Sequence, residues 1–146
     1  MTTITGTMRW GGGVKFSGTS TFGHTITTDI AKSAGGEESG FRPTELLLYA
    51  IAGCTGVDVV RILQKQRQDL TGLEIEVTAQ QSENSPAYLE AFNVIYRFTG
   101  NNLDHSKLQR AVELSESKYC SVSITLRKPV KVSTAIEIVE QIPESK

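Results

Sequence analysis

The stretch that decides the fold is Arg42-Pro-Thr-Glu-Leu-Leu-Leu-Tyr-Ala-Ile-Ala-Gly-Cys-Thr-Gly-Val-Asp-Val-Val60. Proline suits the first position of a helix, because the N–H that it lacks would have no partner there. From Leu46 to Ala52 there is no polar residue, and a helix that is apolar all round has to be buried all round. We therefore expect a central helix from Pro43 to about Gln68, amphipathic beyond Gly56.

The segments around this helix predict strands and a second helix. Before it, Thr, Phe, Val and Ile alternate with glycines, which is typical of short antiparallel strands joined by turns. After it, Leu, Ile and Val alternate with polar residues, which predicts a half-exposed antiparallel pair. Asp104 is a good helix N-cap. The expected elements are two or three strands within 4–29, a flexible connection over 34–40, strands around 73–78 and 92–98 with a turn over 81–88, a helix over 104–119, a helical turn over 121–126 and a last strand over 130–139.

The length of 146 residues predicts one domain over residues 1–146, and the expected strands and helices make it α+β. The net charge of −1 gives no electrostatic reason to expect nucleic acid or a membrane as partner. No continuous apolar run reaches the roughly 18 residues of a membrane span. Met1 to Trp10 lack the apolar core of a secretory signal, so a cytoplasmic location is expected.

Cys54 and Cys120 are the residues most suited to chemistry. In a reducing compartment, two cysteines are more often reactive or simply buried than a structural staple. Burial as a small apolar residue is the simpler interpretation of each. Gly53 and Gly56 flank Cys54, and glycine in a helix permits close approach by a ligand or another helix. The cysteines are 66 positions apart, so spacing does not predict whether they meet.

A reactive thiolate needs a nearby positive charge or hydrogen-bond donor. Arg61 returns to nearly the same helix face as Cys54, but about 10 Å further along the axis. A surface ion pair between Asp58 and Arg61 is the simpler interpretation of that arginine. Arg9 and Arg42 are the alternative cations, and the sequence does not choose among them.

Glu45 is the acid nearest the start of the central helix. It lies about 13 Å before Cys54 along the axis, where the helix dipole alone would favour an acid. A catalytic role is the alternative. His24 and His105 are isolated and have no metal-ligand spacing, and no phosphate-loop Lys-Ser/Thr follows Gly11 to Gly13. We therefore expect neither a metal nor a cofactor.

Two motifs carry a family resemblance. The stretch from Arg42 to Val60 resembles the central helix of the OsmC/Ohr family, named from osmotic induction and organic hydroperoxide resistance. Lys118-Tyr-Cys-Ser-Val-Ser123 resembles that family's second cysteine motif, and the similarity extends over essentially the whole chain. The resemblance implies the OsmC-like α+β fold, an intertwined homodimer in which antiparallel sheets wrap two long central helices and the sites lie at the subunit interface.

The resemblance also implies roles for both cysteines. Cys54 matches the cysteine that attacks the peroxide and becomes a sulfenic acid, and Cys120 matches the one that resolves it to a disulfide. A dithiol, often lipoyl-bound, then reduces the disulfide. The hydroperoxide reductases of the family carry a Glu directly after the helix-opening Pro, where this chain has Thr44, with Glu45 one place later. Their activating Arg comes from an N-terminal loop, for which Arg9 is the candidate. The chain is therefore closer to the less characterised OsmC-like branch.

The sequence is compatible with two functions. The first is a thiol-dependent peroxidase of organic hydroperoxides, part of an oxidative stress response, with Cys54 and Cys120 catalytic and Glu45 and Arg9 supporting them. The alternative is a non-enzymatic module that binds an apolar small molecule, with structural cysteines. In either case the all-apolar helix predicts an obligate homodimer, with two copies packed through Gly53 and Gly56.

Overall fold

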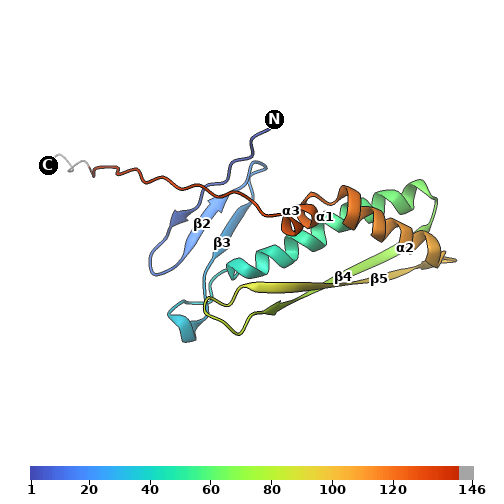
Figure 1. Ribbon diagram of the computed structural model, residues 1–146, viewed down its shortest axis with the longest axis horizontal. Coiled ribbons are helices and arrows are strands. Elements are labelled where there is room, and N and C mark those ends of the chain that lie inside the picture. Colours follow the sequence, from blue (N-terminus) through green and yellow to red (C-terminus); the bar gives the residue numbers. More distant parts are fainter. Residues whose placement is uncertain (142–146) are drawn as a thin grey trace.

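A long helix lies along a long two-stranded sheet in the computed structural model, which describes residues 1–141 (Figure 1). The helix is α1 (Pro43–Lys65), and the antiparallel strands are β4 (Asp69–Gln81) and β5 (Leu89–Asn101). After β5 come the helix α2 (His105–Leu114), the π-helical turn η2 (Ser115–Tyr119) and the short helix α3 (Ser121–Arg127). The α+β class is confirmed.

A small second sheet precedes the helix. It consists of β1 (Arg9–Trp10), β2 (Phe16–Thr19) and β3 (Thr25–Thr28) in the order β1-β2-β3, all antiparallel. The predicted short strands are therefore present. This sheet projects beyond one end of α1 rather than packing on the β4–β5 pair (Figure 1). A bridge between Thr28 and Phe41, and an edge-on contact between the rings of Phe41 and Tyr49, tie it to the start of α1.

The connection between β3 and α1, which includes the segment predicted as flexible over 34–40, is held by several hydrogen bonds. It contains the 3-10 turn η1 (Lys32–Ala34) and wraps around the buried Asp29 carboxylate. That carboxylate accepts hydrogen bonds from the Ser39 hydroxyl and from the backbone N–H groups of Ile30, Glu37 and Ser39. The Ser39 hydroxyl, with the three N–H groups, holds the pKa of Asp29 well below its usual range. The Asp29 carboxylate thus holds together the short glycine-rich connection between β3 and α1.

The hairpin β4–β5 follows the predicted alternation. Leu73 pairs with Phe98, Ile75 with Tyr96 and Val77 with Val94, which places these side chains on one face, toward the helices. The connecting residues fall within the predicted 81–88 turn. On that face lies the core, formed by Val59, Leu63 and Ala111 with partly buried Leu70, Leu73, Phe98, Leu108 and Val112 around them.

Within one chain helix α1 buries one face only, so its predicted burial on all sides would need a second copy. Ile51, Thr55, Val59 and Leu63 recur every four residues and face the sheet and α2. On the other face Tyr49 and Val57 are exposed, and Leu47, one turn before Ile51, is exposed as well. A single chain supplies one long helix and one hairpin, which can cover one side of α1.

The two glycines of α1 have different surroundings. A Cβ atom on Gly56 would lie 3.2 Å from Cδ1 of Ile75, whereas one on Gly53 would have nothing within 4 Å. Gly56 therefore serves the packing of α1 on β4 in its own chain. Of the two glycines proposed for a helix–helix contact between copies, only Gly53 is free to make it.

By length and composition α1 is the one helix in residues 1–141 that could cross a membrane. The core helix of a soluble protein has the same properties. Its apolar run ends at Asp58, and its buried face packs against the sheet and α2.

The second helical segment begins where predicted and changes pitch before the second cysteine. Asp104 caps α2 by accepting a hydrogen bond from the N–H of Ser106. The backbone N–H of Cys120 then donates to the carbonyl of Ser115 at 2.7 Å, five residues back. This wider π-turn ends at Cys120, which caps α3. The predicted helical turn after Cys120 is confirmed as α3.

The last predicted strand, over 130–139, is absent from the structure. Residues 128–141 adopt no regular structure and are exposed throughout. Val132, Ile136 and Val139 are 80–92% exposed. The alternation of apolar residues is typical of a strand, but a strand needs an edge to pair with, and no neighbouring edge in residues 1–141 takes this segment.

Candidate functional site

The fold brings the two cysteines together. Cys54 lies in the middle of α1 and Cys120 at the junction of η2 and α3. The Sγ atoms of both cysteines and a carboxylate oxygen of Asp58 all lie within 4.8 Å of one another. Both thiols are free, Cys120 buried and Cys54 partly exposed. A disulfide needs the sulfurs at about 2.05 Å, so the two sulfurs have to move closer before they can bond.

The start of α3 favours the thiolate of Cys54. Burial raises the pKa of this thiol, but hydrogen bonds from the backbone of Val122 and from the side chains of Cys120 and Ser121 outweigh it. The hydroxyl of Ser121 lies 3.8 Å from Cys54 Sγ. The charge of Asp58 opposes ionisation, yet the net shift of the Cys54 pKa is downward. Cys54 is therefore the better nucleophile of the pair.

The pKa of the Cys120 thiol shifts in the opposite direction, upward. Burial raises the pKa of its thiol, and the neighbouring Cys54 raises it further. Donation from Ser123, whose backbone N–H lies 3.4 Å from Cys120 Sγ, compensates only in part. The pair therefore consists of a thiolate-forming Cys54 and a Cys120 that keeps its proton.

A chain of buried hydroxyls lies beneath the cysteines. Ser115, fully buried, donates to Asp58 at 2.9 Å and lies 2.8 Å from the hydroxyl of Thr55. Thr55, also fully buried, lies 2.9 Å from the hydroxyl of Tyr96, which donates to Glu116. Burial is the largest cause that raises the pKa of Tyr96 to about 12. The chain joins α1, β5 and η2 and fixes the position of Asp58.

Replacing Thr55 with valine should destabilise the fold without changing the shape of the side chain. The substitution leaves Ser115 and Tyr96 each with one lost partner in a buried site, which costs about 1–2 kcal/mol of unfolding free energy. Urea unfolding measures the effect. Thr78→Val on the exposed face of β4 is the matched control, expected to change stability by about 0.5 kcal/mol or less. Equal effects would mean that the buried hydroxyl chain contributes nothing.

Asp58 does not pair with Arg61, so the surface ion pair favoured by the sequence is wrong. Among residues 1–141 none of the ion pairs includes Asp58. At four residues beyond Cys54, the carboxylate turns toward α2 and η2 and accepts the Ser115 hydrogen bond. Arg61 is exposed.

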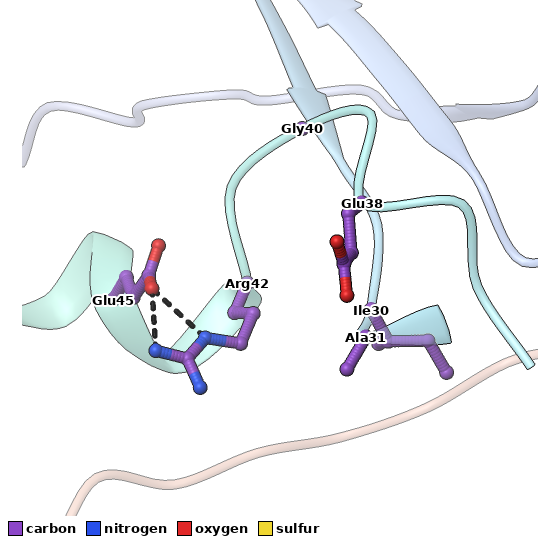
Figure 2. Close-up of a pocket in the computed structure, with 6 residues that line it drawn as sticks. All are labelled: Ile30, Ala31, Glu38, Gly40, Arg42 and Glu45. Carbon is purple, nitrogen blue, oxygen red and sulfur yellow. Dashed lines mark hydrogen bonds and ion pairs between the residues drawn. The ribbon is translucent and has the colours of Figure 1, made fainter. Parts of the chain in front are cut away.

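Glu45 and Arg42 form a separate site at the start of α1. The Arg42 guanidinium contacts Glu45 Oε1 at 2.7 and 2.8 Å, and the pair borders a cavity of about 280 Å³ with Ile30, Ala31, Glu38 and Gly40 (Figure 2). A Cβ on Gly40 would overlap the carbonyl of Thr27, so glycine is required for this loop to close. Glu45 also borders a second hollow with Leu48, Tyr49 and Ile75.

The predicted supporting residues are not brought to the thiols within one chain. Contacts with Cys54 in the described part of the chain come from Ser121, Val122, Cys120 and Asp58. Arg9 lies exposed in the projecting sheet, paired across from Ser17. The catalytic roles of Glu45 and Arg9 therefore remain predictions that need a second subunit.

The sequence did not predict four residues as part of the site. These are Thr55, Tyr96 and Ser115, together with Asp58, which lies next to both thiols. Thr55 and Asp58 carry a weak signal, because polar residues in an otherwise apolar helix require partners. Ser115 and Tyr96 carry none, since their contacts join residues that are 41 to 60 positions apart.

Comparison with known proteins gives consistent matches. Residues 35–135 match the family described as OsmC-like protein. Protein YhfA of Escherichia coli K12 is 36% identical over 132 residues, covering 90% of this chain and 96% of YhfA. The crystal structure of a hypothetical protein from Aquifex aeolicus is 31% identical with a TM-score of 0.76, covering 87% of this chain and 89% of that one.

More distant structures share the fold. The organic hydroperoxide resistance protein OhrB of Bacillus subtilis is 23% identical with a TM-score of 0.57, covering 86% of this chain and 91% of OhrB. At that identity the likeness concerns the fold alone.

Proposed function

Since the chain belongs to the OsmC-like family, we propose that it is a thiol-dependent peroxidase that reduces organic hydroperoxides through Cys54 and Cys120. The observation that carries the proposal is the proximity of a thiol with a lowered pKa to a second thiol that keeps its proton. The substrate class is the one implied by the resemblance of the two cysteine motifs to the OsmC/Ohr family.

The chemistry takes place in three steps. The Cys54 thiolate attacks the outer oxygen of ROOH, the O–O bond breaks, and the alkoxide takes a proton to leave as ROH. Cys54 is then a sulfenic acid, and Cys120 attacks its sulfur, so that a disulfide forms and water leaves. A dithiol reductant, such as a lipoyl-bound dithiol, then exchanges with the disulfide and is itself oxidised to a disulfide.

Three groups beside Cys54 suit the first step. The Val122 backbone and the Ser121 hydroxyl stabilise the attacking thiolate. Ile51, one turn before Cys54, borders a hollow of about 520 Å³ that extends to Ser123 and Leu126. Neither cysteine lines this hollow, but Ile51 and Ser123 are each three residues from a cysteine along the chain, and we propose the hollow as the place for the organic part of the peroxide.

An anaerobic titration tests the proposal. Reduced protein treated with one equivalent of a bulky alkyl hydroperoxide should lose both thiols of each subunit and gain an intramolecular disulfide, detected by mass spectrometry after alkylation. An unchanged thiol count at stoichiometric peroxide would contradict the proposal and favour the binding module. A binding module gives no reason for the two sulfurs to lie so close together, so their proximity counts against that alternative.

The proposal includes a cytoplasmic homodimer. The exposed face of α1, the projecting sheet and the exposed apolar residues of 130–139 all lack partners within the described part of the chain. A second copy would cover them, with residues 130–139 pairing as a strand. Such an assembly would also allow Glu45 or Arg9 of one subunit to approach the thiols of the other.

A further inference from the structure

Cys54, Asp58 and Cys120 offer three ligand atoms of the kind that a zinc site uses. Thiolate sulfur and carboxylate oxygen are both ligands of Zn²⁺, and zinc sites with three protein ligands keep the fourth position for water or substrate. In a tetrahedral site with Zn–S bonds of about 2.3 Å, two sulfurs lie about 3.8 Å apart. The three atoms lie within 4.8 Å of one another, so each pair needs to close by at most about 1 Å.

Hydrogen bonds hold the Asp58 carboxylate in place. The buried Ser115 hydroxyl donates to Asp58 Oδ2, and Ser115 is held by Thr55, which is itself hydrogen-bonded to Tyr96. Within residues 1–141 no hydrogen bond to the other oxygen, Oδ1, is found, and one of the two carboxylate oxygens lies within 4.8 Å of both sulfurs. Partners of this kind orient metal ligands, and their loss typically weakens binding about 10- to 100-fold.

The charge of the cluster also favours a cation. Asp58 forms no ion pair with any Lys or Arg among residues 1–141. Two thiolates and a carboxylate together would carry three negative charges in a partly buried place. A divalent cation would neutralise most of this charge, and a metal displaces the protons of coordinating thiols outright.

We propose that Cys54, Asp58 and Cys120 form a binding site for a thiophilic divalent cation such as Zn²⁺, with water in the fourth position. Binding requires both thiols to be reduced and does not require peroxidase activity. Since Cys54 is partly exposed, the cation and its water reach the site from solvent at that side. Soft sulfur ligands favour Zn²⁺ over Mg²⁺ or Ca²⁺.

If the proposed peroxidase reaction also holds, metal and peroxide compete for the same sulfurs. Oxidation of the bound dithiolate by ROOH, with two protons taken up, gives the disulfide, ROH, water and free Zn²⁺. Bound zinc would then slow the first turnover, and peroxide would release the metal in a ratio of one to one. A disulfide offers no thiolate, so release follows from loss of the ligands.

Cobalt titration of the reduced full-length protein under nitrogen tests the site without any peroxide. One Co²⁺ per subunit should give the near-ultraviolet absorption of thiolate-to-cobalt charge transfer, and Zn²⁺ should abolish it by displacement. Cys54→Ser and Cys120→Ser should each lose intensity, because each removes one thiolate. Asp58→Asn should retain the band but bind about 10-fold more weakly or worse.

Glu113→Gln, which removes an exposed carboxylate from α2, is the matched control and should bind as the parent protein does. Two results would overturn the site: no charge-transfer band in protein that titrates for two thiols, or an affinity unchanged by Asp58→Asn. Peroxide consumption is measured separately on metal-free protein, so failure of the peroxidase and failure of the metal site can be distinguished.

Discussion

Replacing Cys54 with serine should reduce peroxide consumption to the background rate. A serine hydroxyl is not ionised near neutral pH and does not attack the O–O bond, so neither the sulfenic acid nor the disulfide can form. Rapid mixing with an alkyl hydroperoxide, followed by an assay of the remaining peroxide, measures the loss.

Cys120→Ser should behave differently. Its Cys54 is intact, so one equivalent of peroxide should be consumed at close to the parental rate, and the sulfenic acid should then persist. A sulfenic-acid trap detected by mass spectrometry reports it. Because Cys120 also donates a hydrogen bond that lowers the Cys54 pKa, a modest slowing of the first turnover is expected. Loss of the first turnover in both variants alike would contradict the assigned roles.

Replacing Gly53 with leucine should have opposite effects in a monomer and in a dimer. In the single chain the position faces open space, and leucine is a better helix former than glycine by about 0.8 kcal/mol, so a monomer would be stabilised. If two copies of α1 meet at Gly53, each added side chain overpacks the contact at a cost of about 1–3 kcal/mol. Summed over both copies this weakens association by more than tenfold.

Sedimentation at low micromolar concentration distinguishes the two cases. We expect the parent chain to sediment as a dimer whose melting temperature falls on dilution, since folding and association are linked. Gly53→Leu should shift it toward monomer, and Lys65→Leu at the exposed end of α1 should not. A well-folded parental monomer, or a Gly53→Leu chain that melts higher, would rule out a dimer through this face.

Local sequence patterns were sufficient to predict most of the secondary structure. Pro43, the alternations over 73–78 and 92–98 and the Asp104 cap each act over a few residues, and each predicted its element correctly. Lys65 ends α1 three residues before the predicted Gln68, because the Gln66 cap and the positive φ of Arg67 turn the chain into β4. The strand predicted over 130–139 is absent because its formation depends on an edge elsewhere, which an alternation pattern does not specify.

The candidate site was predictable in its residue types but not in its geometry. The motif resemblance identified Cys54 and Cys120, while their proximity follows from the way η2 returns to α1. Asp58 was assigned to Arg61 because i,i+3 pairs are common on helix surfaces, yet its carboxylate accepts a hydrogen bond from the buried Ser115 instead. Asp58 also lies beside the thiols, a combination that histidine and cysteine spacing could not indicate.

The π-turn before Cys120 makes this part of the chain tolerant of substitution but intolerant of a change in length. A π-turn holds one residue more than an α-turn, and each residue of a helix advances the chain by about 100° around its axis. Ser117, Lys118 and Tyr119 are exposed, so other side chains could replace them. Deleting any one of them would let the turn tighten and rotate Cys120 away from Cys54. Natural variation here should therefore take the form of exchanges, with insertions and deletions excluded between Ser115 and Cys120.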